Sequence, residues 1–99
     1  MPTYVTLYTL TDQGIRNIRQ APNRLQSAIK AVEAAGGKLL SFYLTMGQYD
    51  YVIVSEAPND EAVAALALSI GSLGNVRSTT MRAFTQQEYV NIIKKLPAA

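Results

Sequence analysis

The fold is decided by residues 39–56, LLSFYLTMGQYDYVIVSE, in which two apolar runs flank Gly47 and Gln48. β-Branched and aromatic residues favour strands, and glycine at the first central position of a two-residue turn supplies the positive φ of type II′. The pattern therefore predicts a β-hairpin with strands at residues 38–46 and 49–56, joined by a tight turn at Gly47 and Gln48.

Strand and helix patterns alternate on both sides of this hairpin. Two further strands are predicted, at residues 3–10 and 76–84. Three helices are predicted, at residues 21–35, 60–73 and 86–96. Asn59 has the side chain of an N-cap, and Thr85 with Glu88 has the spacing of a capping box. These residues mark where the second and third helices begin.

A short helical lead is predicted at residues 14–20, directly before the first long helix. Pro22 separates the two, because proline is tolerated in the first turn of a helix but breaks a helix interior. The spacing of Ile15 and Ile18 predicts that both side chains point inward.

The order β-α-β-β-α-β, followed by a helix, is the ferredoxin-like split βαβ pattern of the α+β class. Right-handed crossovers predict an antiparallel sheet with strand order 4-1-3-2 and both main helices on one face. The other face also needs cover, because Val52 and Val54 alternate with the equally apolar Tyr51 and Ile53. We therefore expect the chain to form a homodimer or a higher homo-oligomer.

Length and composition limit the possible classes of protein. The chain has 99 residues and is predicted to form one domain, residues 1–99. Charged residues make up 16% of it, below the usual ~25%, which agrees with surface hidden in an assembly. The sequence has no stripe of basic residues that could bind nucleic acid. It also has no signal-peptide pattern and no run of ~20 apolar residues that could span a membrane. A cytoplasmic protein that binds neither nucleic acid nor membranes is expected.

Cysteine and histidine are both absent from the sequence. Disulfides, thiolate ligands and imidazole ligands are therefore excluded, and with them the usual zinc sites and histidine-based catalytic triads. We expect neither a metal nor a cofactor.

Several segments, taken together, resemble the GYD-domain family, which is named for a Gly-x-Tyr-Asp segment. The matching segments are residues 14–18 (GIRNI), 21–24 (APNR), 36–37 (GG) and 47–50 (GQYD). The resemblance covers nearly the whole chain and implies a dimeric α+β barrel, in which two ferredoxin-like sheets pack face to face.

Tyr49 and Asp50 are the candidates for a catalytic pair, a phenol beside a carboxylate at the mouth of a strand. Adjacent residues of a strand point to opposite faces, however, so the pair cannot serve one face together. The alternative interpretation is that Asp50 accepts backbone or arginine hydrogen bonds and that Tyr49 packs at an interface.

A ligand site is predicted where arginines and tyrosines of neighbouring strands converge, because guanidinium binds carboxylate and phosphate. The predicted ligand-binding residues are Tyr8, Arg16, Tyr49, Tyr51 and Arg82. The alternative is that the arginines are solvated or paired with carboxylates.

The tyrosines also resemble the base-stacking residues of RNA-recognition motifs, which use a ferredoxin-like sheet. Asp50 and Glu56 on the same strand would repel phosphate, so the sequence argues against RNA binding.

The sequence therefore predicts a homodimeric small-ligand-binding module, whose ligand is a small acidic or aromatic molecule. The alternative is a cofactor-independent enzyme of the monooxygenase, isomerase or cyclase type that acts on a small hydrophobic substrate.

Overall fold

A computed structural model describes residues 1–98 of the chain, and its strands and helices follow the predicted order. The strands are β1 (Thr3–Leu10), β2 (Lys38–Leu44), β3 (Tyr51–Glu56) and β4 (Val76–Ala83). The helices are α1 (Asp12–Arg16), the 3-10 helix η1 (Ile18–Gln20), α2 (Ala21–Ala34), α3 (Asp60–Ser72) and α4 (Gln86–Ile93).

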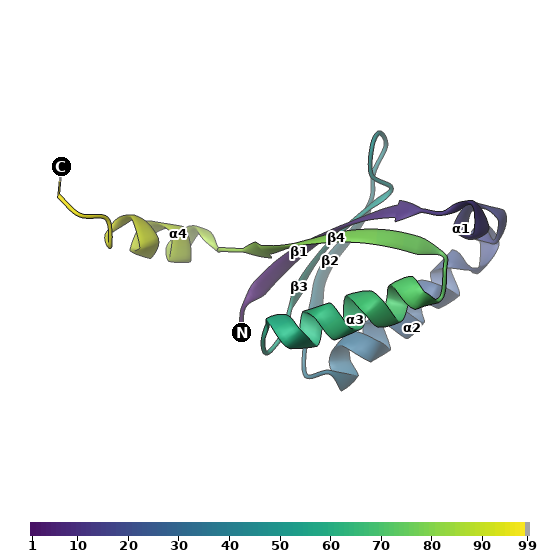
Figure 1. Ribbon diagram of the computed structural model, residues 1–99, viewed down its shortest axis with the longest axis horizontal. Coiled ribbons are helices and arrows are strands. Elements are labelled where there is room, and N and C mark those ends of the chain that lie inside the picture. Colours follow the sequence, from purple (N-terminus) through teal and green to yellow (C-terminus); the bar gives the residue numbers. More distant parts are fainter. Residues whose placement is uncertain (99) are drawn as a thin grey trace.

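The four strands form one antiparallel sheet in the order β2-β3-β1-β4, which confirms the predicted ferredoxin-like topology. Figure 1 shows α2 and α3 side by side on one face of this sheet. Tyr8 of β1 pairs with Tyr51 of β3, and Tyr4 of β1 pairs with Arg82 of β4. Since paired residues share a face, this register determines which side chains meet the helices.

Local capping explains why three of the helices begin where they do. Asn59 accepts a hydrogen bond from the Ala62 amide at 2.9 Å, as an N-cap does. Thr85 and Glu88 form the predicted capping box at the start of α4. Thr11 caps α1 by accepting a hydrogen bond from the Gly14 amide at 3.1 Å.

The predicted two-residue turn of the hairpin is wrong. β2 ends at Leu44 and β3 begins at Tyr51, so a six-residue loop joins them. The Thr45 amide donates to the Asp50 carbonyl at 2.7 Å and closes this loop. Asp50 in turn binds β1: its amide donates to the Tyr8 carbonyl at 2.8 Å, and its carboxylate accepts from the Leu10 amide at 2.8 Å. Asp50 is thus held by both Thr45 and β1, and residues 46–49 form the turn between Thr45 and Asp50.

Gly47 has a φ of +112° in this loop, so the predicted positive φ is confirmed. No atom lies within 4 Å of the position that a Cβ would take, so the cost of a side chain there is conformational rather than steric. We expect Gly47→Val to lower the free energy of unfolding by ~1 kcal/mol or more. Urea denaturation should detect the loss, and Gln48→Val in the same loop is the matched control. Equal midpoints for the two variants would contradict this prediction.

Regular alternation along β2 would place Leu39 and Phe42 on opposite faces of the sheet, but the structure differs. Leu40 forms an irregularity in β2, where the pairing shifts between Leu39 and Ser41, so Leu39 faces the helices together with Phe42. The extra residue reverses the alternation expected from a regular strand.

Ile15 of α1 is exposed rather than inward. The reason is that α1 contacts the rest of the chain through the backbone of its only buried residue, Gly14, which lies against Asn75. Ile18 lies in η1; it is 43% exposed and borders the space between the sheet and the helices.

One chain by itself buries few side chains completely. Among residues 1–98, the buried residues are Tyr4, Thr6, Gly14 and Ala57. The accessible surface is 6935 Å², about 1,400 Å² more than the roughly 5,500 Å² usual for a 10.8 kDa monomer. Two features explain this excess: the sheet face opposite α2 and α3 is uncovered, and α4 projects away from the body (Figure 1).

The uncovered face carries a cluster of apolar side chains, which we call the open-face patch. Its members share the face opposite the helices according to the strand pairing: Val5, Leu7, Tyr43, Val52, Val54 and Met81. Tyr43 and Met81 are 62% and 44% exposed. Such a patch is typical of a surface that packs against another protein.

Candidate functional site

A large cleft lies between the sheet and helices α2 and α3, and we call it the outer cleft. Its volume is about 740 Å³, within the 300–1,000 Å³ range of ligand pockets. Most of its wall is aliphatic, with contributions from Leu10, Leu25, Leu44, Ile53, Ile70, Leu73 and Val76. The cleft therefore suits an apolar ligand or the apolar part of a larger one.

Three aromatic rings form the sheet side of the outer cleft. They come from three neighbouring strands: Tyr8 on β1, Tyr51 on β3 and Phe42 on β2. The Phe42 and Tyr51 ring centroids are 5.1 Å apart with a tilt of 40°, a favourable aromatic arrangement. These rings give the cleft a rigid wall on which a flat apolar group can stack.

Tyr8 is a polar group of this wall and also lines a smaller cavity beside the cleft. Burial alone raises the pKa of its phenol, so the hydroxyl stays protonated near neutral pH and can donate a hydrogen bond. None of the described residues that line the outer cleft is Asp, Glu or His. Tyr8, Tyr51 and Arg24 are therefore the titratable groups that line the outer cleft.

Arg24 brings a positive charge to the outer cleft. Its guanidinium donates to the Asn17 carbonyl at 2.8 Å and to the Gly14 carbonyl at 3.5 Å, which holds it against the end of α1. Both partners are uncharged, so the guanidinium keeps its net charge for a ligand. Guanidinium groups of this kind bind carboxylates well.

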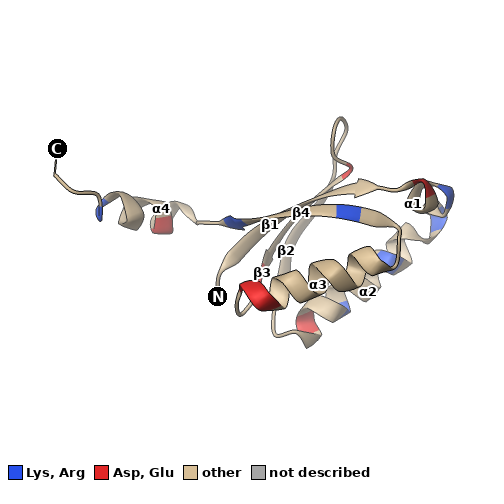
Figure 2. Cartoon of the chain, viewed as in Figure 1, with Lys and Arg blue, Asp and Glu red and all other residues tan. Residues whose placement is uncertain are grey.

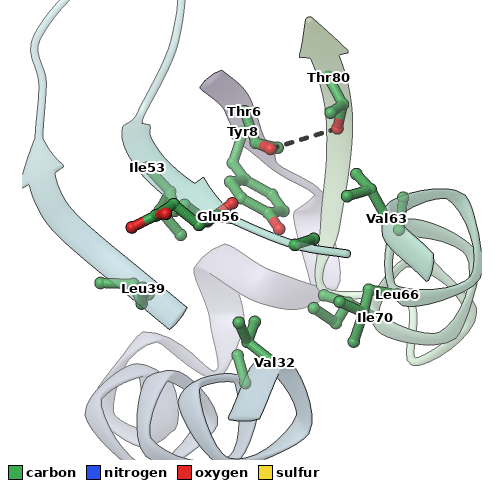
Figure 3. Close-up of a pocket in the computed structure, with 14 residues that line it drawn as sticks. Thr6, Tyr8, Val32, Leu39, Ile53, Glu56, Val63, Leu66, Ile70 and Thr80 are labelled. Carbon is green, nitrogen blue, oxygen red and sulfur yellow. Dashed lines mark hydrogen bonds between the residues drawn. The ribbon is translucent and has the colours of Figure 1, made fainter. Parts of the chain in front are cut away.

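A small inner cavity of about 40 Å³ continues from the outer cleft toward the middle of the sheet (Figure 3). Tyr8 and Ile53 line both spaces. Thr6 and Thr80 face the inner cavity, and their hydroxyl oxygens are 3.2 Å apart. This polar end has room for a few water molecules.

Of the five predicted ligand-binding residues, the structure brings Tyr8 and Tyr51 together in the outer cleft. Tyr49 lies in the hairpin loop, where its carbonyl accepts from the Thr45 hydroxyl at 2.6 Å. Arg16 lies exposed on α1. These two side chains do not line the cleft.

Arg82 lies at the opposite end of the sheet from the cleft mouth. Its guanidinium carbon is 4.4 Å from the centroid of the Phe84 ring and 5.8 Å from that of Tyr4. One of its nitrogens is 3.8 Å from the Glu88 carboxylate. Arg82 therefore joins β4 to the start of α4 and is not part of the cleft.

Asp50 of the Gly-x-Tyr-Asp segment has a structural position. Its carboxylate accepts the Leu10 amide hydrogen at the point where β1 leaves the sheet. β3 does not extend far enough to offer this amide a carbonyl group, so the carboxylate takes the place of the backbone acceptor. This contact matches the alternative interpretation of Asp50 given above.

The tyrosines do not form a base-stacking platform. Tyr8 and Tyr51 face the helices, and the Tyr4 hydroxyl donates to the Asp60 carboxylate of α3 at 2.5 Å. This hydrogen bond raises the pKa of Tyr4 and ties β1 to α3. The rings are thus directed away from the uncovered face, where an RNA-recognition motif stacks its bases.

Two cleft residues, Arg24 and Phe42, are not among those predicted from the sequence. Arg24 lies in the first turn of α2, in the segment 21–24 noted above, but its approach to the cleft depends on the carbonyls of α1. Phe42 faces the cleft because it pairs with Ile53, on the regular side of the irregularity at Leu40. No pattern within residues 21–24 indicates the contact of Arg24.

Comparison with known proteins assigns the chain to a family. The GYD domain model matches residues 4–93, which include the Gly-x-Tyr-Asp segment. The chain belongs to the GYD domain family. A Thermus thermophilus protein named glutamine synthetase and cystathionine beta-lyase binding protein is 32% identical to this GYD-domain protein over 95 residues. The match covers 95% of this chain and 100% of that relative.

Solved structures share the fold of this GYD-domain protein. The Mycobacterium tuberculosis leucine response regulatory protein LrpA aligns with a TM-score of 0.63 and 24% identity over 86% of this chain. The chain spans about half of that regulator, 51% of its length. The Thermus thermophilus protein TTHA0845 aligns with a TM-score of 0.54 and 24% identity, over 86% of this chain and 95% of its own. At this level of identity the likeness shows the fold alone.

Metal clusters and membrane helices are both missing from residues 1–98. These residues contain no group of three His, Cys, Asp or Glu side chains that could hold a metal ion. Within the same part of the chain, no helix has the length and apolar character needed to cross a membrane.

Proposed function

We propose that this GYD-domain protein is a homo-oligomeric binding module that holds a small molecule in its outer cleft. The observation that carries the proposal is the cleft itself, about 740 Å³ between the sheet and two helices, with a mainly apolar wall. A space of this size and character is what small-molecule sites usually offer.

The polar groups of the cleft support a ligand with an acidic or hydroxylated end. Tyr8 supplies a neutral hydroxyl and Arg24 supplies a positive charge, while the aromatic wall accepts the apolar part. Medium-chain or aromatic carboxylic acids combine these features. They are the class of ligand that we propose.

Homo-oligomer formation is supported by the surface that one chain leaves exposed. The accessible surface of one chain is about 1,400 Å² larger than is usual for a monomer of this mass. A standard interface buries ~800 Å² on each partner, so the additional surface is large enough to form one. The open-face patch is the part of the sheet best suited to such contact, because the outer cleft lies on the other face. A face-to-face dimer would leave the cleft accessible.

Replacing the Tyr8 hydroxyl tests the ligand site. In calorimetric titrations with aromatic and medium-chain carboxylic acids, we expect Tyr8→Phe to weaken binding about fivefold, the effect of one lost hydrogen bond of ~1 kcal/mol. The ring and its packing remain, so the melting temperature should change little. Tyr49→Phe is the matched control, because Tyr49 lies outside the cleft, and its affinity should equal that of the unsubstituted chain.

A second candidate function is binding to enzymes, which the name of the 32% identical Thermus relative favours. Such a partner would cover the open-face patch and the exposed apolar side chains of α4, which are Tyr89, Val90, Ile92 and Ile93. Binding of purified glutamine synthetase or cystathionine beta-lyase to the immobilised protein, together with no response to any of the acids, would favour this second function over the first.

A further inference from the structure

The outer cleft and the inner cavity lie one after the other along the same strand. On β1, Leu10 lines only the outer cleft, Tyr8 lines both spaces and Thr6 lines only the inner cavity. Every second residue of a strand points to the same face, so these three side chains form one row on the face that meets the helices. The row leads from the outer cleft into the inner cavity.

The helices show the same order. On α2, Arg24 lines only the outer cleft, Ala28 lines both spaces and Val32 lines only the inner cavity. Residues four apart in a helix lie on the same side, so these three also form one row. On α3, Ile70 lines both spaces and Leu66 lines only the inner cavity. Because the strand and both helices agree, the two spaces form one channel, with Ala28 and Ile70 at its junction.

The channel has the length of a medium-chain acid. The four positions from Leu10 to Thr6 correspond to roughly 13 Å, because a strand rises ~3.3 Å per residue. The eight positions from Arg24 to Val32 correspond to about 12 Å, at ~1.5 Å per residue of helix. Extended decanoic acid spans about the same length, so one such molecule can contact both ends of the channel.

The two ends of the channel differ in charge. Arg24 supplies a positive charge at the outer end. None of the described residues that line the inner cavity is Lys or Arg, and Glu56 is among them. Figure 2 shows acidic residues in the last turn of α2 and the first turn of α3, at the end of the helix layer opposite α1. A carboxylate is therefore favoured at the outer end and disfavoured at the inner end.

The hydroxyl groups of Thr6 and Thr80 form the polar part of the inner end (Figure 3). Thr6 is only 7% exposed, so its hydroxyl lies away from bulk water. A hydroxyl has one hydrogen and two lone pairs, and the bond between the two threonines uses one hydrogen and one lone pair. The second hydrogen is left for a bound neutral group. The inner cavity of about 40 Å³ exceeds the ~10–15 Å³ that one water needs, so a terminal hydroxyl fits there.

We infer that the channel binds a carboxylic acid with a neutral hydroxyl or carbonyl group at its far end. The carboxylate lies at Arg24, and the neutral group lies at Thr6 and Thr80. The inference rests on the proposed function and specifies the ligand of the same site. Thr6 and Thr80 then determine specificity, because an acid with an apolar end leaves their remaining hydrogen-bonding groups without a partner.

Calorimetric titration of the full chain with two matched acids tests the inference. The acids are decanoic acid and its ω-hydroxy derivative, which differ by one oxygen atom at the end opposite the carboxylate. We expect the hydroxylated acid to bind at least ~5-fold more tightly, the effect of one additional hydrogen bond. Equal or weaker binding of the hydroxylated acid would overturn the inference.

A variant with both Thr6→Val and Thr80→Val tests which residues set this preference. Replacing both members of the pair keeps the shape of the site and leaves no threonine hydroxyl without its partner. The variant should bind the two acids equally, and decanoic acid should lose no affinity. The matched control carries Thr9→Val and Thr79→Val, because strand pairing places both residues on the face of the open-face patch. The control should keep the ~5-fold preference, and an unchanged preference in the first variant would overturn the inference.

The failure of the inference and that of the proposed function are distinguishable. If none of the medium-chain or aromatic acids binds the unsubstituted chain, the ligand site and the inference are rejected together. If decanoic acid and its ω-hydroxy derivative bind with equal affinity, the inference alone is rejected and the proposed binding module stays in place.

Discussion

Gly14→Ala is expected to destabilise the fold by ~3 kcal/mol. A Cβ built on Gly14 would lie 2.1 Å from the Asn75 carbonyl oxygen and 3.0 Å from its carbon, so the backbone itself must move. That carbonyl is held in place, because it accepts a hydrogen bond from the Thr11 amide at 3.0 Å. Forcing one methyl group into such a contact typically costs 1–3 kcal/mol, and weakening the hydrogen bond adds ~1 kcal/mol.

Urea denaturation of the purified variant measures this loss, and Gly71→Ala is its matched control. Gly71 lies in α3 with an ordinary helical φ, and no atom lies within 4 Å of the position that its Cβ would take. Alanine there should therefore be neutral or stabilising by up to ~1 kcal/mol. If Gly14→Ala unfolds at the same urea concentration as the unsubstituted chain, α1 does not press against Asn75 as described.

Val54→Asp is expected to raise the dimer dissociation constant about 1,000-fold, equivalent to ~4 kcal/mol of association free energy. Val54 lies on β3 and pairs with Val5 of β1 in the centre of the open-face patch. In the proposed face-to-face dimer, the carboxylate introduced at position 54 would be buried without an opposite charge beside it. Removing a charge from water in this way is among the most costly single changes at an interface.

Sedimentation over a range of concentrations tests this expectation, with Gln26→Asp as the control because Gln26 is exposed on α2. The control should keep the mass of the unsubstituted protein, while Val54→Asp shifts to the mass of one chain. Unaltered mass for Val54→Asp would show that the chains associate through another surface. Ligand binding should persist in the single chain, because the outer cleft lies on the opposite face of the sheet.

Sequence alone determined the class of fold, the element order and the starts of α2, α3 and α4 in this protein. Asn59 and the Thr85–Glu88 pair cap their helices as their spacing predicts, because capping depends on residues only three positions apart. The sheet order follows from the element order through the handedness of the crossovers. These signals are local or topological, so they are independent of how side chains meet across the sheet.

Tertiary structure alone decided the hairpin loop, the strand faces and the composition of the cleft. The distant Tyr8 carbonyl and Leu10 amide bind Asp50 at the end of the hairpin, and Leu40 changes the alternation of β2. Tyr8 and Tyr51 meet because two strands more than forty positions apart share one register. Arg82 pairs with Tyr4 at the far end of the same register and is thereby kept from the cleft. Register and cleft depend on contacts between distant segments, and no pattern within one segment encodes them.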